Sequence, residues 1–106
     1  MHELADMSQE PQLDYERFDV YKASLAFLVL SAKLIASLPG GYASFADQLK
    51  RAATYRQRFF GISRGSAMEC GAILDAFHAL SLIDDAQFLE GKSLIVRIVS
   101  MLTKMT

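Results

Sequence analysis

The chain has a single cysteine and no tryptophan, and only two of its 106 residues are proline. One cysteine excludes an internal disulfide and any cysteine-rich metal site. No segment alternates apolar and polar residues as a half-buried strand does, and no internal repeat of roughly 20–50 residues is present. A phosphate-binding loop, a dinucleotide fingerprint and a His-Glu-x-x-His metal motif are also missing. These absences favour an all-α domain that is not an enzyme and holds no cofactor or metal.

Charge is nearly balanced, since the formal net charge is −1. A chain with this balance has no general attraction to nucleic acid. The charges are unevenly distributed, however, because residues 1–19 hold six acids and one base, whereas no acid lies between Asp47 and Glu69. The bases of that second stretch are Lys50, Arg51, Arg56, Arg58 and Arg64.

Apolar residues make up 52% of the chain, a high share for a domain with so much surface for its volume. Either a membrane span or an interface between copies accounts for such a share. The longest apolar stretch, residues 23–38, contains Lys33 and three serines and is too short to cross a bilayer. No secretory signal is visible at the start. We therefore expect a cytoplasmic homo-oligomer with no membrane association.

Helical periodicity begins after residues 1–14, which we interpret as a mobile tail preceding a domain of residues 15–106. The first helix is expected at about residues 20–38, with Asp19 as its N-cap. It is apolar over well beyond half its circumference, more than one buried face requires. This coverage indicates that the helix packs inside the protomer and also against a neighbouring copy.

Three further helices follow. Pro39-Gly40-Gly41 ends the first helix, and residues 44–47 resemble a capping box that starts the second. The third runs to about Leu80 and is rich in glycine and alanine, which favours close helix packing. A second capping box at residues 84–87 starts the fourth helix, where Leu89 and Val96 lie off the main apolar face. Short connections between these helices predict an antiparallel up-down-up-down four-helix bundle.

Glu69 lies on the apolar face of the expected third helix, together with Ser66. A carboxylate on a packing face needs a partner, because an unpaired buried charge costs several kcal/mol. The second helix offers Arg51 and Gln48, so we predict a mostly buried ion pair in a structural polar cluster. A catalytic role for Glu69 would need a cleft and a partner such as histidine.

Two other reactive side chains have structural interpretations. Cys70 lies near Phe77 on the helical wheel and is expected to be a small core residue. His78 shares a polar stripe with Arg64 and Asp75, so we expect it to be solvated. It is not spaced with Cys70 as a metal-binding pair.

The basic residues from Lys50 to Arg64 alternate with Tyr55, Phe59 and Phe60. A mixture of cations and aromatic rings suits phosphates and stacked bases. The alternative interpretation is a solvated helix end whose aromatic rings belong to the core. In a ring of copies the cluster would repeat around the axis, and its contacts to phosphates would add.

Four short motifs give the chain a resemblance to a known family. They are Val20-Tyr21-Lys22, Asp47-Gln48-Leu49-Lys50-Arg51-Ala52-Ala53, Arg64-Gly65-Ser66-Ala67-Met68-Glu69-Cys70 and Leu82-Ile83-Asp84. In this order and spacing they resemble the four helix bundle protein family, which includes the protein encoded in the 23S ribosomal RNA intervening sequence. The accessory variability determinant of diversity-generating retroelements resembles the chain more closely. The likeness covers about residues 13–103.

The resemblance implies a four-helix bundle assembled as a homopentamer, with no catalytic activity. In the retroelement branch it also implies binding to RNA and to a reverse transcriptase through a basic surface. The chain departs from the family after Arg51-Ala52-Ala53, where relatives continue with a run like Ser-Ile-Pro-x-Asn-Ile-Ala-Glu-Gly.

An antiparallel turn needs a connection of roughly 2–8 residues, usually with glycine or proline in it. Neither residue type occurs between Ala43 and Phe60. Either the second and third helices fuse into one rod, or a segment is missing near residues 54–55. We expect the second.

Two functional hypotheses follow from these observations. The first is a non-enzymatic oligomeric scaffold that binds structured RNA or an RNA-bound partner such as a reverse transcriptase. The second is an assembly module that binds only protein. A salt-sensitive shift of RNA in a gel distinguishes them.

Overall fold

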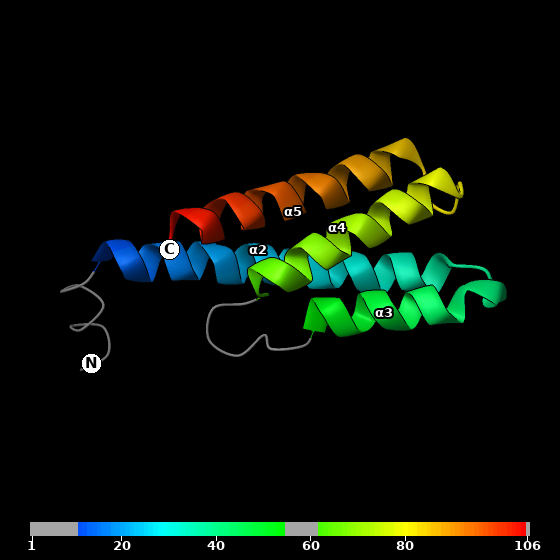
Figure 1. Ribbon diagram of the computed structural model, residues 1–106, viewed down its shortest axis with the longest axis horizontal. Helices are drawn as coiled ribbons and strands as arrows, with labels where there is room; N and C mark the ends of the chain where they lie inside the picture. The colour runs from blue at the N-terminus through cyan, green and yellow to red at the C-terminus, as the bar shows by residue number, and fades with distance from the viewer. Residues whose placement is uncertain (1–10, 55–61, 106) are drawn as a thin grey trace.

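The computed structural model describes residues 11–54 and 62–105, which are all-helical and contain no strand (Figure 1). The four helices are α2 (Pro11–Ser37), α3 (Ala43–Thr54), α4 (Arg64–Ala79) and α5 (Asp85–Lys104), with a 3-10 turn, η1 (Gly40–Tyr42), before α3. The arrangement is compatible with the predicted four-helix bundle and measures 50 × 21 × 21 Å.

The helices contact one another in a closed series of pairs. In the described chain α2 packs on α3, α3 on α4, α4 on α5, and α5 returns to α2. Figure 1 shows α2 and α3 side by side, and α4 and α5 next to each other and tilted relative to the first pair. Every helix therefore has a face toward one shared core, whose largest fully buried side chains are Phe27, Phe77, Leu34, Leu49, Ile62, Leu74 and Ile98.

The first helix is longer than its sequence pattern predicted. It spans Pro11–Ser37, so residues 11–14 are helical, and the remainder of the expected tail lies outside the described residues. Proline is well placed in the first turn of a helix, because the N–H it lacks has no partner there. Asp19 is therefore a residue within the helix, not its cap, and its carboxylate lies 3.9 Å from the ammonium of Lys22.

By length and composition, one described segment, Arg17–Ser37 of α2, could cross a membrane. The sequence estimate that the apolar stretch is too short is therefore wrong on length, because the helix extends toward the N-terminus. A core helix of a soluble protein and a signal sequence near the N-terminus pass the same test. Val20, Phe27 and Leu34 of this segment are buried, and 39% of its most apolar window is buried inside the molecule.

The second and third helices are separate, and the fused rod is excluded. α3 ends at Thr54 and α4 begins at Arg64. Ser63 caps α4, since its hydroxyl accepts the backbone N–H of Ser66 at 3.2 Å. The segment that we expect to be missing near residues 54–55 stays a prediction. The junction between residues 54 and 55 itself lies outside the described residues.

The two predicted capping boxes have different outcomes. In α5 the prediction is confirmed, because Asp84 accepts the N–H of Gln87 and Gln87 accepts the N–H of Asp84, both at 2.8 Å. In α3 it is wrong, because the turn η1 runs directly into the helix and places Ser44 inside its first turn.

Two glycines allow α4 and α5 to approach closely, as the content of small residues predicted. A Cβ added to Gly91 would lie 2.8 Å from Leu74 Cδ1, and one added to Gly71 would lie 3.3 Å from Ile95 Cγ2. Gly65 has no such neighbour within 4 Å. Close packing thus explains Gly71 and Gly91 but not Gly65, and Gly61 lies outside the described residues.

Two serines of α2 are buried in the interior. The Ser31 hydroxyl donates to the carbonyl of Phe27 at 2.8 Å. The Ser24 hydroxyl accepts the backbone N–H of Ile62 at 3.0 Å. This second bond joins positions 38 residues apart and fixes the segment that enters α4 against the middle of α2.

Candidate nucleic-acid interface

Three of the five predicted nucleic-acid residues lie in the described chain. Lys50 and Arg51 are exposed near the end of α3, and Arg64 is exposed at the first position of α4. Arg56 and Arg58 lie outside the described residues. Arg51 and Arg64 therefore flank the connection between α3 and α4, at the left end of these helices in Figure 1.

The C-terminal end of α5 belongs to the same region. The guanidinium Nε of Arg64 donates to the Thr103 hydroxyl at 3.1 Å, across 39 residues of sequence. The neighbouring Lys104 is exposed in the last turn of α5. Sequence reasoning did not group Lys104 with the other basic residues. The expected antiparallel order of the helices could have indicated this position, because it places the end of the fourth helix beside the start of the third.

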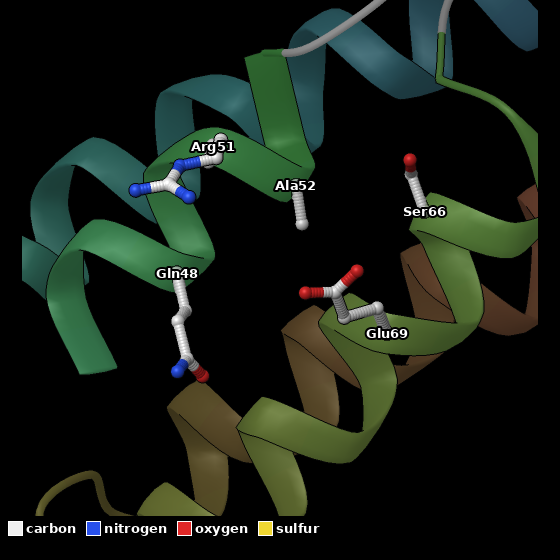
Figure 2. Close-up of a pocket in the computed structure, with 5 residues that line it drawn as sticks. All are labelled: Gln48, Arg51, Ala52, Ser66 and Glu69. Carbon is white, nitrogen blue, oxygen red and sulfur yellow. The ribbon is translucent and has the colours of Figure 1, made fainter. Parts of the chain in front are cut away.

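The predicted polar cluster lines a small pocket between α3 and α4. Gln48, Arg51 and Ala52 come from α3, and Ser66 and Glu69 come from α4 (Figure 2). The pocket has a volume of about 130 Å³ and is open to solvent. The structure thus brings together all four polar side chains that the sequence suggested.

The predicted buried ion pair is wrong, however. Glu69 and Arg51 are both exposed, and neither forms an ion pair within the described part of the chain. Figure 2 shows the Arg51 guanidinium pointing away from the Glu69 carboxylate. Exposed charges of this kind remain hydrated, so neither needs the other for stability.

The error arose because Glu69 lies at the edge of the face that α4 turns to the core. That face contains Ala67, Cys70, Gly71, Ile73, Leu74 and Phe77. Glu69 lies to one side of these residues, where its carboxylate reaches water.

Cys70 is buried, as predicted. Burial raises the pKa of its thiol to about 12, and the nearby charge of Glu69 adds to the shift. A thiol with this pKa stays protonated at neutral pH, and only the thiolate is a good nucleophile. Cys70 is therefore suited to packing and not to covalent chemistry.

His78 is half-buried and has partners, which corrects the expectation that it is solvated. Its Nε2 lies 2.7 Å from Asp85 Oδ1, and its ring stacks on Phe88 with centroids 4.1 Å apart. Lys92 pairs with Asp75 at 2.8 Å and lies 5.7 Å from the Phe88 ring centroid. These contacts connect α4 to α5 beside their turn. Within residues 11–54 and 62–105, no three histidine, cysteine or acidic side chains are grouped as metal ligands.

Comparison of the chain with models of known protein families finds no match, and comparisons with curated proteins and with solved structures find none either. The resemblance to the four helix bundle protein family therefore remains a prediction based on the four motifs.

Proposed function

We propose that this protein is a non-enzymatic, homo-oligomeric scaffold that binds structured RNA or an RNA-bound protein such as a reverse transcriptase. Each copy is an antiparallel up-down-up-down four-helix bundle in the cytoplasm, and the motif resemblance favours five copies. The alternating direction is supported by the colours in Figure 1, which run along successive helices in opposite senses.

The observation that carries the proposal is the basic end of the bundle, formed by Lys50, Arg51, Arg64 and Lys104. These four side chains are exposed and come from the ends of three different helices. Cations fixed on separate rigid elements can contact phosphates along a folded RNA, and each contact releases counterions. A ring of copies would present this basic end several times on one face.

A catalytic role has less support. Glu69 is exposed in its pocket, and Cys70 is buried and protonated. A general acid acts in a site sheltered from solvent, and a nucleophile needs an accessible thiolate. Glu69 and Cys70 thus lack the environment that these two roles require.

A gel-shift titration with structured RNA at several salt concentrations tests the proposal. Wild-type affinity should fall steeply as salt rises, and Lys50→Gln with Arg64→Gln should weaken binding and reduce the salt slope by about 1.5. Arg97→Gln is the matched control, because Arg97 is exposed on α5 about two turns before the basic end. Wild-type protein without RNA affinity at low salt would contradict the RNA-binding proposal.

The alternative function is an assembly module that binds only protein. It is favoured by exposed apolar side chains on the outer faces of α2 and α5, among them Val29 and Leu89. In that case the basic end would only complement the negative C-terminal ends of α3 and α5. An oligomer in light scattering with no affinity for RNA would support this alternative.

A further inference from the structure

An exposed apolar stripe runs along α2 on the side opposite its buried face. Leu25, Val29, Ala32 and Ala36 are all exposed and follow one another at spacings of four, three and four residues. Val29 is 56% exposed, whereas Phe27 on the opposite side is fully buried. This spacing keeps side chains in line along one helix and is the spacing used in coiled-coil contacts.

A second stripe of the same spacing runs along the outer face of α5. Leu89, Ser93, Val96 and Ser100 are exposed, and Leu89 and Val96 are 63% and 58% exposed. Among the described residues, α2 and α5 therefore each carry a narrow stripe with large apolar side chains uncovered. The alanines of the first stripe and the serines of the second are small enough to let another helix approach closely.

We infer that the outer stripe of α2 packs in antiparallel orientation against the outer stripe of α5 in a second copy of this chain. The inference rests on the proposed homo-oligomeric scaffold and identifies the surfaces that would form it. In one antiparallel register, large residues meet small ones or residues of similar size. The opposed pairs are Ala36 with Leu89, Ala32 with Ser93, Val29 with Val96, and Leu25 with Ser100.

The charges beside the stripes match in this same register. Lys33 flanks the α2 stripe where Glu90 flanks the α5 stripe, and both are exposed. Toward the other end of the contact, Asp19 of α2 faces Lys104 of α5. Flanking positions of this kind set partner choice and orientation in helical pairs. Opposite charges at both ends therefore favour this register over one shifted along the helix.

Antiparallel packing also fits a closed ring. In the proposed bundle α2 and α5 run in opposite directions within one copy. If α2 of one copy is antiparallel to α5 of the next, every copy points the same way. A head-to-tail contact repeated with one orientation closes into a ring when its rotation permits.

Pairing each stripe with itself is the competing arrangement. Self-pairing needs two different interfaces, α2 with α2 and α5 with α5, to cover the two stripes that one type of α2–α5 contact covers. An α2–α2 contact that sets Leu25 opposite Val29 would also place Lys22 opposite Ala32, inside the contact. The α2–α5 register puts Lys22 opposite Thr103, at the end of the contact. A single heterologous interface is therefore the more economical arrangement.

Disulfide trapping tests the inference. Val29→Cys and Val96→Cys variants, carrying different affinity tags, are co-expressed, purified and oxidised with copper phenanthroline. We expect covalent dimers that contain one chain of each kind, and little dimer when either variant is oxidised alone. The double variant should give a ladder of cross-linked species that ends at the copy number of the ring. The native Cys70 is buried, so wild-type protein provides the background.

Met68→Cys, exposed on the outer face of α4, is the matched control and should not cross-link to Val29→Cys. Dimers of Val29→Cys with itself would overturn the inference in favour of like-with-like pairing. No cross-link in a protein that light scattering shows to be oligomeric would overturn this interface and leave the scaffold proposal standing. A monomer in light scattering would overturn both.

Charge reversal gives a second test that needs no cysteine. Lys33→Glu should raise the dissociation constant between copies about fivefold, because it sets a second acid opposite Glu90. Adding Glu90→Lys should restore the wild-type value. Failure of the double variant to restore association, with helicity unchanged, would show that these two residues do not face each other.

Discussion

Replacing Ser24 with alanine would leave the backbone N–H of Ile62 without an acceptor in the protein interior. The two groups form a 3.0 Å hydrogen bond, and both residues are almost completely buried, at 0% and 1% exposure. Water therefore has no access to the orphaned N–H, whose desolvation costs about 1–3 kcal/mol. Alanine removes only one oxygen, so the added cavity contributes little. We expect Ser24→Ala to lower the free energy of unfolding by about 2 kcal/mol.

The matched control is Ser31→Ala, which also removes one buried hydroxyl from α2. Ser31 donates to the carbonyl of Phe27 in its own helix, and that carbonyl keeps its helical partner when the hydroxyl is lost. Its cost should therefore stay under about 1 kcal/mol.

Thermal and urea unfolding, followed by circular dichroism at one protein concentration, compare the two variants. At about 4–8 °C for each kcal/mol, Ser24→Ala should lower Tm by about 10 °C. Equal stability of the two variants would refute the idea that this bond fixes the entry to α4.

Three other predictions concern helices α4 and α5. Gly65→Ala should stabilise the protein by up to about 1 kcal/mol, because the site around Gly65 is open. Gly91→Ala should destabilise it by about 1–3 kcal/mol, because the new Cβ meets buried Leu74. Chemical denaturation measures both changes. Glu69→Gln should change the free energy of unfolding by less than about 0.5 kcal/mol, and a loss of several kcal/mol would reinstate the buried ion pair. Cys70 should resist iodoacetamide at about pH 8 in the native state, since its pKa is about 12, and react after unfolding, as mass spectrometry would detect.

Local sequence chemistry predicted the start of α5 well. Asp84 and Gln87 satisfy each other's backbone N–H groups within four residues, so no distant contact is needed to place that helix end. The core faces of α3 and α5 also follow a helical period, through Leu49, Ala52 and Ala53 in α3 and through Gly91, Ile95 and Ile98 in α5. These features depend on neighbours in the chain, which a sequence displays directly.

The orientation of α4 could not be predicted in the same way. Glu69 lies four residues before Ile73 and eight before Phe77, which are both buried, so a helical wheel places it beside them. The wheel does not show how far the buried face extends, and the edge that carries Glu69 is open to solvent.

The candidate site was predictable only in part. Lys50, Arg51 and Arg64 stood out as a run of cations in the sequence. Lys104 joins them through the bond between Arg64 and Thr103, which spans 39 residues and needs the packed bundle. Long-range hydrogen bonds of this kind leave no local signal, so the extent of the basic end required the structure.

The pairing of α2 with α5 has a consequence for synthesis on the ribosome. The first and last of the four described helices complete the core together, so α2 emerges long before the helix that covers part of its apolar face. At about 5–20 residues per second, that face stays uncovered for seconds in the nascent chain. Chaperones that bind apolar helices should therefore associate with ribosomes translating this chain until α5 has emerged, and ribosome profiling of chaperone-bound complexes can detect the interval.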